Sequence, residues 1–426
     1  MSTARSVAVI GGGWAGLAAA VEASRRGSQV TLFEMAPQLG GRSRDVHVAG
    51  VALDNGQHIA IGAYSATLAL MRDLGVQERQ AFLRTPLRLV DANGDGLVLQ
   101  TGTPWLAFVR GVIAHRTWRP LDKLSLLRAA AGWLAGGFRC ADVLTVAQLT
   151  RGVRTRIQRE LIEPLCVAAL NTGAHEASAQ VFLRVIADTL FGGRGASDLL
   201  LPRLGLGDLL PTPAARWLDR NGATIRLRYR VRELTAVGTG WSVHGETFDR
   251  VVLAATAQEN ARLVATIAPA WADTASAIPF APIITVYLRN QGAVLPGPML
   301  SLSASADHPA QFVFDRGQLS GADGLLAFVI SGAEAWVERG GEAALEATRF
   351  QAEKALGAFL RGPLELVQVV TEKRATFRCT PALRRPTKRI AMNLWAAGDY
   401  LEGPYPSTLE GAVRAGFAAG HAASSS

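Results

Sequence analysis

The first 34 residues of the chain contain two short apolar runs separated by a stretch with helical character. Residues 7–10 are all apolar, which is typical of a strand buried on both faces of a parallel sheet. Residues 29–33 form a second such run, and the pattern between the two runs predicts a helix. The chain therefore begins with a predicted strand–helix–strand unit.

The apolar pattern of the remaining chain predicts further elements of three kinds. Two runs, 87–90 and 97–100, flank the turn-rich sequence at 93–96 and predict a β-hairpin. Helices are predicted within 122–190 and over 207–220, the latter ended by Asn221-Gly222. Short strands are predicted within 223–255, a second, antiparallel sheet at 283–288, 311–314, 325–330 and 364–371, and a last buried strand at 394–397.

A glycine motif connects the first predicted strand to the first helix. Gly11 permits a tight turn, Gly13 leaves room for a pyrophosphate beside the backbone, and Gly16 lets the helix pack close to the strand. The phosphates would then meet the helix N-terminus at Trp14 and Ala15. Glu34, at the end of the second strand, is placed to accept hydrogen bonds from ribose hydroxyls and disfavours NADP. These features predict a dinucleotide site.

Two other segments favour FAD over NAD as the dinucleotide. In the first, the pair Gly40-Gly41 lets the chain pass close to the ligand, and Arg42 can reach its phosphates. In the second, Asp399 follows Gly398 at the carboxyl edge of the last predicted strand, where an acid can bind a ribityl hydroxyl. A helix that begins near Ser407 can stabilise negative charge on a flavin ring, and its predicted contacts are Thr408, Leu409 and Ala412.

Together these motifs resemble those of the amine oxidase, phytoene desaturase and protoporphyrinogen oxidase superfamily of flavoproteins. Within it the chain is most similar to the squalene-associated FAD-dependent desaturases, the hydroxysqualene dehydroxylases of bacterial hopanoid synthesis. The stretches that carry this likeness are 54–58, 163–172, 177–182 and 405–416. The resemblance implies noncovalent FAD with contacts from Gly56, Gln57, His58 and Val231. After Asp399 the chain departs from the pattern, with Tyr400 and Leu401 where a Trp and a small hydroxyl residue are expected.

These features predict an α/β fold with two domains, because 426 residues exceed the size at which a single core usually stops growing. The first is a Rossmann-like FAD-binding domain of the glutathione-reductase-like type. The second is an inserted α+β substrate-binding domain with a mainly antiparallel sheet and a helical cap. We assign residues 1–75, 205–262 and 388–426 to the FAD-binding domain and residues 76–204 and 263–387 to the substrate-binding domain.

The family resemblance implies a reductive reaction in which reduced FAD supplies hydride to hydroxysqualene, a long-chain isoprenoid, and the hydroxyl leaves as water. A proton donor should assist this departure, and His58 and Tyr405 are the candidates because both lie in motifs expected beside the flavin. His58 has the alternative role of anchoring its turn through a backbone hydrogen bond, and Tyr405 that of a pocket wall. Asp54, Glu402 and Glu410 are further ionisable groups; Asp54 is expected to fix its loop, and Glu410 to complement a helix dipole.

Three other functions stay open on the sequence. An oxidative polyene desaturase would share the fold with the opposite electron flow. An amine oxidase is disfavoured, because none of the four lysines is an evident candidate beside the flavin. A lipid-binding module without redox activity would have no need for three intact cofactor motifs. FAD reduction requires a separate electron donor, since Gly205-x-Gly207 lacks the third glycine and the preceding strand of a second fingerprint.

The net charge and the cysteine content limit the partners and the cellular location that we expect for the protein. The net charge of +9 and pI near 10.1 favour an anionic membrane surface over nucleic acid, because the cations are spread along the chain without a nucleic-acid motif. Residues 104–139 mix aromatic, aliphatic and basic side chains and predict either an interfacial segment or a helical cap packed on the protein. Three cysteines without a Cys-x-x-Cys motif predict no disulfide framework and no metal site. With no signal peptide or spanning run, we expect a cytoplasmic protein, peripheral at the inner face of the membrane.

Overall fold

The computed structural model describes residues 4–48 and 50–425, and it opens with the predicted parallel unit. β1 (Ser6–Ile10) leads through α1 (Trp14–Arg25) to β2 (Gln29–Phe33), and β1 pairs in parallel with β2. Val7, Ala8 and Val9 are fully buried, as expected for a strand covered on both faces. The strand–helix–strand prediction is confirmed.

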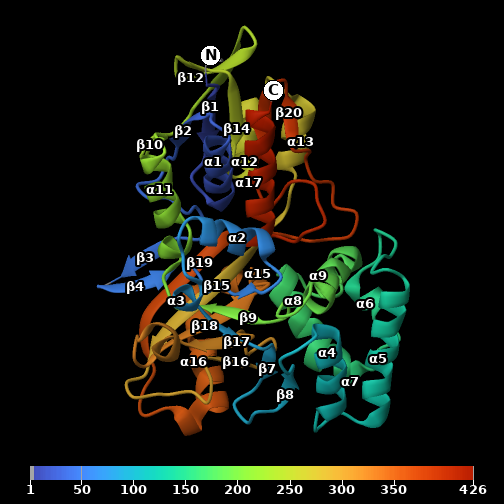
Figure 1. Cartoon of the computed structure of the whole chain (residues 1–426). Coiled ribbons are helices and arrows are strands. Elements are labelled where there is room, and N and C mark those ends of the chain that lie inside the picture. The colour runs from blue at the N-terminus through green and yellow to red at the C-terminus, as the bar shows by residue number, and fades with distance from the viewer. Residues whose placement is uncertain (1–3, 49, 426) are drawn as a thin grey trace.

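This unit is the centre of a six-stranded sheet with the order β10-β2-β1-β14-β21-β20. The sheet lies in the upper part of Figure 1, together with both chain termini. β20 runs antiparallel to β21, and the other neighbouring pairs are parallel. The strands that join β1 and β2 are β10 (Thr224–Arg226), β14 (Arg250–Leu253), β20 (Arg389–Ala391) and β21 (Leu394–Ala396).

Two helices from opposite ends of the chain pack side by side next to this sheet. They are α1 and α17 (Leu409–Ser424), and both are rich in alanine and glycine, so their backbones can approach closely (Figure 1). α11 (Pro211–Arg220) also packs against α1. The remaining elements here are a meander of β11 (Leu234–Val237), β12 (Gly240–Val243) and β13 (Glu246–Phe248), and the helices α12 (Ala257–Val264) and α13 (Pro269–Ser276).

A five-stranded antiparallel sheet forms the lower part of the molecule in Figure 1, with the order β16-β17-β18-β15-β19. The side chains of β15 alternate between two apolar clusters, with Ile284 and Val286 in one and Ile283 and Tyr287 in the other. The four predicted strands of the second sheet are confirmed, and the fifth, at 299–301, was not predicted. Its strands and helices are β15 (Phe280–Arg289), β16 (Met299–Ser301), β17 (Phe312–Asp315), α14 (Arg316–Ser320), β18 (Leu325–Ser331), α15 (Glu334–Arg339), α16 (Gly341–Leu356), the 3₁₀ helix η2 (Gly357–Phe359) and β19 (Glu365–Phe377).

A group of helices lies beside this sheet, at the lower right of Figure 1, within the region predicted to be helical. One turn is a π-helix, η1 (Gln158–Ile162). It leads into the helix 163–170, whose second residue, Pro164, has no N–H to close an α-helical hydrogen bond. The group comprises α4 (Pro104–Ala114), α5 (Pro120–Ala135), α6 (Val146–Leu149), α7 (Thr155–Ile157), η1, α8 (Glu163–Leu170) and α9 (Ala179–Phe191).

Short elements join the two sheets. The predicted hairpin is confirmed as the antiparallel pair of β7 (Arg88–Val90) and β8 (Gly96–Val98). The others are β3 (Asp45–Val48), β4 (Val51–Asp54), β5 (Ala60–Ile61), α2 (Ser65–Asp73), α3 (Glu78–Ala81), β6 (Phe82–Thr85), β9 (Leu199–Pro202) and α10 (Leu206–Leu209). Among the described residues, no helix is long and apolar enough to cross a membrane.

The structure corrects two local predictions near residue 205. The single helix predicted over 207–220 is two helices, because Pro211 disfavours helical backbone at Leu210 and removes an N–H. A strand does precede Gly205 and Gly207, contrary to the prediction, but this strand, β9, pairs antiparallel with β5 and β6. The N–H of Gly207 donates to the Asp45 carboxylate at 2.9 Å, so these glycines are part of an internal contact.

Candidate active site

One large cavity lies where the six-stranded sheet meets the five-stranded sheet and the helices. Its volume is about 1290 Å³, which exceeds the roughly 300–1,000 Å³ of a pocket for one drug-sized ligand. One part of its wall carries the predicted cofactor motifs, and the other is mainly apolar. The cavity therefore has room for a dinucleotide and a second, apolar ligand.

The two N-terminal glycine motifs lie against each other at one end of this cavity. The N–H of Gly40 donates to the carbonyl of Gly12 at 2.9 Å. A Cβ added at Gly13 would meet only the Cα of Gly41, at 3.9 Å, so the space beside Gly13 is open to the cavity. A Cβ at Gly16 would lie 1.8 Å from the carbonyl oxygen of Gly11, which shows how closely α1 approaches the turn. This is the cradle that a pyrophosphate needs.

The acid at the end of β2 supports the same turn. The carboxylate of Glu34 is buried and accepts hydrogen bonds from the N–H of Gly12 at 2.6 Å and of Ala36 at 2.7 Å. Val231 is also buried, and its carbonyl accepts from Arg262 at 3.0 Å. The expected backbone contact with adenine would therefore be made by the N–H of Val231.

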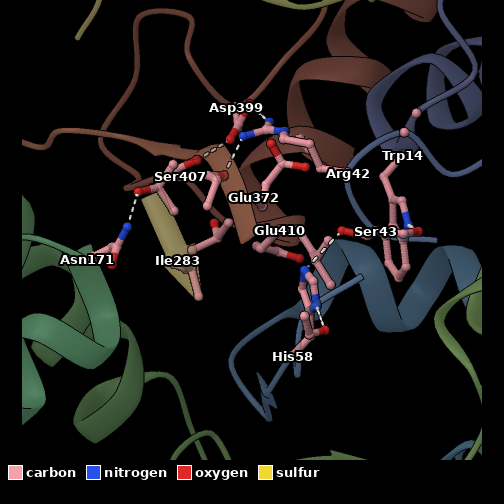
Figure 2. A pocket seen from close by; sticks show the side chains of 18 of the residues that line it. Trp14, Arg42, Ser43, His58, Asn171, Ile283, Glu372, Asp399, Ser407 and Glu410 are labelled. Atoms are coloured by element: carbon pink, nitrogen blue, oxygen red, sulfur yellow. Dashed lines mark hydrogen bonds and ion pairs between the residues drawn. The ribbon is translucent and has the colours of Figure 1, made fainter. Parts of the chain in front are cut away.

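Arg42 and Asp399, which were expected to hold different parts of the cofactor, form an ion pair of 2.6 Å (Figure 2). The hydroxyl of Ser407 donates to the second oxygen of Asp399. Burial acts to lower the pKa of Arg42, but the neighbouring carboxylates, Asp399 above all and also Glu372, together raise it above its ordinary value. The guanidinium is thus a permanent cation in the wall of the cavity.

The N-termini of two helices contribute to the wall. At α1, Trp14 and Ala15 are buried and line the cavity, and the indole N–H of Trp14 donates to the carbonyl of Ser43 at 3.3 Å. At α17, the hydroxyl of Thr408 accepts from the N–H of Gly411 at 3.1 Å and caps the helix, and Leu409 lines the cavity. Both helix ends can therefore stabilise negative charge on a ligand.

The structure brings together nearly all the predicted site residues. Gly16 does not line the cavity but packs behind the turn. The residues that line it are Gly11, Gly13, Trp14, Ala15, Glu34, Gly40, Gly41, Arg42, Gly56, Gln57, His58, Val231, Gly398, Asp399, Tyr405, Thr408, Leu409 and Ala412. Segments that are hundreds of residues apart in sequence thus share one cavity.

His58 is held on both sides of its ring (Figure 2). Its Nδ1 lies 2.8 Å from the carbonyl of Gly56, which can only accept, so Nδ1 carries the proton. Its Nε2 lies 3.1 Å from the hydroxyl of Ser43. Burial lowers the pKa of His58, which favours the neutral ring. This arrangement favours the anchoring role of His58 over proton donation.

The Asp54 motif is a buried network behind the cavity. Asp54 accepts from the N–H of Leu206 at 2.9 Å and lies 3.6 Å from the guanidinium of Arg316, which donates to Gln57 at 3.1 Å. Burial raises the pKa of Asp54 to about 6, and Arg316 opposes this shift only in part. Because Gln57 lines the cavity and Asp54 does not, the expected loop-fixing role of Asp54 agrees with its contacts.

Neither of the two glutamates considered as proton donors has the environment expected of one. Glu402 is exposed and lies outside the cavity wall. Glu410 is buried, and its carboxylate accepts from the N–H groups of Ala66 at 3.0 Å and Thr67 at 2.9 Å, in the first turn of α2. Glu410 therefore caps a neighbouring helix, where the sequence predicted only that it would complement the dipole of its own helix.

The wall opposite the cofactor motifs is mainly apolar. Its side chains come from η1, α4, α8, α9, the hairpin β7–β8 and the five-stranded sheet, and they include Leu89, Phe108, Leu161, Leu165, Ile186, Ile283, Met299 and Phe312. Asn171 also lines it and donates to Thr376 at 2.9 Å (Figure 2). Of the four lysines, Lys373 does border the cavity, at an exposed position, which the sequence did not indicate.

Several polar residues of the site were missed on the sequence. Arg184 and Asp188 of α9 form an ion pair of 2.9 Å, and Arg184 donates to the hydroxyl of Tyr405 at 2.9 Å. The signal for them was an oppositely charged pair four residues apart in an otherwise apolar helix. Arg385 donates to the backbone carbonyls of Asp399, Tyr400, Gly403 and Tyr405, at 2.7 to 3.2 Å. No local sequence feature marks that role.

The residue that departs from the family pattern, Tyr400, is accommodated at the edge of the cavity that it lines. Tyr400 is buried, and its hydroxyl accepts from the side-chain amide of Asn260 at 2.6 Å. Leu401 is buried as well. The ring of Tyr400 thus replaces the expected residue without leaving a buried hydroxyl unpaired.

Comparison with known proteins agrees with this geometry. Three curated relatives are similar over nearly the full length. Two of them are the hydroxysqualene dehydroxylase of Sinorhizobium fredii, 28% identical over 97% of this chain and 96% of that protein, and the one of Rhodopseudomonas palustris, 29% identical over the same shares. Among solved structures, an oxidoreductase from Methanosarcina mazei has a TM-score of 0.74 at 14% identity, covering 97% of this chain and 99% of that chain. Cyclohexylamine oxidase from Brevibacterium oxydans has a TM-score of 0.66 at 18% identity, covering 99% of both chains.

The residues present fit FAD. The glycine cradle, the two helix N-termini, Glu34 and the N–H of Val231 supply the contacts that a dinucleotide needs. The family model for flavin containing amine oxidoreductases matches residues 14–422. The chain is a FAD-dependent oxidoreductase and belongs to the family of flavin containing amine oxidoreductases.

Proposed function

We propose that this enzyme reductively removes the hydroxyl group of hydroxysqualene to give squalene, with FAD bound noncovalently. The observation that carries the proposal is that the cofactor motifs and a mainly apolar wall line the same cavity. The names of the three relatives that match nearly full-length support the same substrate. An isoprenoid hydrocarbon is recognised by burial of apolar surface, and this wall offers it.

The noncovalent attachment of FAD is supported by the positions of the cysteines. Cys166 and Cys379 are buried, Cys140 is partly buried, and none of the three lines the cavity. Burial raises the pKa of the Cys379 thiol to about 12, which keeps it protonated and weakly nucleophilic.

The chain's own contribution to the reaction is orientation and the exclusion of water. When bound, FAD supplies hydride chemistry at its ring. The apolar wall positions a hydrocarbon chain alongside the N-terminus of α17, and the scarcity of polar side chains there limits competing hydration. A polar substituent on the substrate has few partners in such a wall, so those few determine its orientation.

The test is product analysis with anaerobically reduced enzyme and hydroxysqualene. We expect squalene and one equivalent of reoxidised flavin per product formed. If oxidised enzyme instead introduces double bonds into a saturated polyene precursor, and reduced enzyme leaves hydroxysqualene unchanged, the dehydroxylation proposal is wrong and the enzyme is a desaturase. The two-domain division at 75/76, 204/205, 262/263 and 387/388 is part of this proposal and predicts that the hydrocarbon chain of hydroxysqualene contacts mainly residues of 76–204 and 263–387.

We also propose that α4 and α5 bind an anionic membrane surface. Apolar side chains of this hairpin divide into two sets: Val112 and Trp118 are buried, whereas Ile113, Leu121 and Leu124 are 59%, 61% and 61% exposed. Trp105 and Leu134 are exposed as well. The hairpin thus combines a packed face with an open apolar face, and the open face matches what an interfacial segment requires.

The charged residues around this open apolar face indicate what it binds. Arg110, Arg116, Arg119, Arg128 and Arg139 are all exposed. Their side chains form no ion pair with the part of the chain that the structure describes, and the one acid of the hairpin, Asp122, is buried. Each such cation near an anionic bilayer contributes about 1 kcal/mol. Cations beside exposed leucine and tryptophan fit a phospholipid bilayer better than a second protein.

Vesicle co-sedimentation tests this surface. The wild type should bind vesicles of phosphatidylcholine and phosphatidylglycerol, and the double variant Leu121→Glu/Leu124→Glu should not. Phe350→Glu is the matched control, because Phe350 is 58% exposed on α16, away from the hairpin, and it should bind as the wild type does. Equal binding by all three proteins would contradict the assignment.

A further inference from the structure

Three polar side chains meet at one place beside the apolar wall. Arg184 and Asp188 lie one turn apart on α9, and the Nε of Arg184 lies 2.9 Å from Oδ2 of Asp188. A terminal nitrogen of Arg184 donates to the hydroxyl of Tyr405 at 2.9 Å. Asp188 and Tyr405 line the cavity, and so do the apolar neighbours Ile186 and Leu190 of the same helix. We call Tyr405, Arg184 and Asp188 the polar trio.

Tyr405 is fixed from three directions. The guanidinium carbons of Arg184 and Arg414 lie 4.9 and 5.3 Å from the centre of its ring, and its backbone carbonyl accepts from Arg385 at 2.9 Å. Because the hydroxyl oxygen accepts a hydrogen bond from Arg184, its own proton points elsewhere. Among the described residues no acceptor lies within hydrogen-bond distance of that proton, and the residue borders the cavity.

The two candidate proton donors differ in whether their proton is free. The hydroxyl of Tyr405 accepts from Arg184, and its own proton has no acceptor among the described residues. Asp188 in turn holds Arg184 in place through the ion pair. His58, the other candidate, has its ring proton committed to the carbonyl of Gly56. It therefore has no proton free for a substrate.

We propose that the polar trio binds the hydroxyl group of the substrate, with Tyr405 as the proton donor and Arg184 as its positioning residue. This inference rests on the proposed dehydroxylation. The C–O bond breaks, and both of its electrons leave with oxygen. The Tyr405 proton joins that oxygen to form water, and the carbon receives hydride from the reduced FAD. Tyr405 regains a proton from solvent, so that the alcohol and reduced FAD give the hydrocarbon, water and oxidised FAD.

The first readout is binding to the oxidised holoenzyme, which does not turn over. The wild type should bind hydroxysqualene more tightly than squalene, measured by tryptophan fluorescence. Tyr405→Phe should lose this preference, with hydroxysqualene about 3- to 10-fold weaker and squalene unchanged. Thr189→Val is the control, because the Thr189 hydroxyl on the same wall is bonded back to the carbonyl of Val185. It should keep the preference.

The second readout is single-turnover reduction by the reduced holoenzyme. Tyr405→Phe should lower the rate by about 10²- to 10⁴-fold with its FAD content unchanged. Arg184→Met should lower the maximal single-turnover rate with little change in the substrate concentration that gives half of it, and Arg184→Lys should restore part of the loss, which a purely structural role would not predict.

The outcomes separate this inference from the proposed function. If the wild type makes no squalene, the proposed function is wrong. If the wild type makes squalene and Tyr405→Phe does so equally fast, or if that variant keeps the preference for hydroxysqualene, the inference about the polar trio is wrong and the proposed function stands.

Discussion

The glycine motif gives a prediction that can be tested at two positions. Substitution of Gly13 should impair FAD binding, whereas substitution of Gly16 should impair folding. At Gly13 the backbone has φ of −73° and ψ of 178°, which any residue adopts, and an added Cβ would touch only Gly41 at 3.9 Å. Gly13→Ala should therefore fold normally, at a cost of about 1 kcal/mol or less. Its methyl group would occupy the space that the pyrophosphate needs, so FAD binding should be lost.

Gly16→Ala should show the opposite behaviour. Its Cβ would lie 1.8 Å from the carbonyl oxygen of Gly11, whereas ordinary contact begins at 3.4 Å. That oxygen is backbone and cannot rotate away, so α1 must shift from the sheet. Forcing atoms into a packed core costs about 1–3 kcal/mol or more. The loss should appear in the stability of the protein even without FAD.

Thermal unfolding with and without added FAD separates the two effects. A ligand at about 100 times its Kd stabilises by about 2.7 kcal/mol. With an unfolding entropy of about 2 cal/mol/K per residue, this raises the Tm of a chain of this length by about 3 °C. We expect that rise in the wild type, none in Gly13→Ala with the apoprotein Tm retained, and a lowered apoprotein Tm in Gly16→Ala. A Gly13→Ala protein that gains the full FAD-dependent rise would refute the cradle.

Three further predictions concern residues around the site. Burial raises the pKa of Asp54 to about 6, above about 3.9 in the unfolded chain, so its protonation favours the folded state. The Tm of the wild type should fall relative to Asp54→Asn as pH rises through about 6, by an equivalent of at most about 3 kcal/mol, and a pH-independent difference would contradict this. Glu410→Ala should lower the Tm by about 1–3 °C, because it leaves the N–H of Thr67 unpaired, while Glu402→Ala at an exposed position should not. A lysine at position 385 cannot donate to the four carbonyls that Arg385 contacts. We therefore expect Arg385→Lys to bind FAD about tenfold more weakly in a titration. An unchanged Kd would show that the segment 399–405 does not need these contacts to bind FAD.

Local patterns of the sequence were sufficient for most of the architecture. The parallel unit at 6–33 and the hairpin at 88–98 could be predicted because strand pairing there joins near neighbours in sequence. The antiparallel strands could be predicted because their apolar residues form runs of strand length. The break at Leu210 was missed, although Pro211 is a local signal for it.

Long-range contacts of polar side chains could not be predicted in the same way. Arg184 and Tyr405 are 221 positions apart, and Asn260 and Tyr400 are 140 apart. Nothing in either local sequence encodes the partner, since an arginine on a helix is usually solvated. For His58 the sequence left two roles open. Its hydrogen bonds to Gly56 and Ser43 favour one of them, because they determine which ring nitrogen carries the proton.

The helix α4 connects the two surfaces on which the proposals depend. Phe108 lines the cavity, while Trp105 and Ile113 of the same helix are exposed. A thirty-carbon hydrocarbon that passed through water would lose about 25 cal/mol for each Å² of apolar surface exposed, a cost that transfer directly from a bilayer avoids. An enzyme acting on such a substrate therefore benefits when the helix that contacts lipid also forms the cavity wall. Membrane binding by α4 and α5 would therefore give the hydrocarbon substrate a direct route from the bilayer into the cavity. If α4 and α5 did not bind lipid, the substrate would have to be delivered by another carrier.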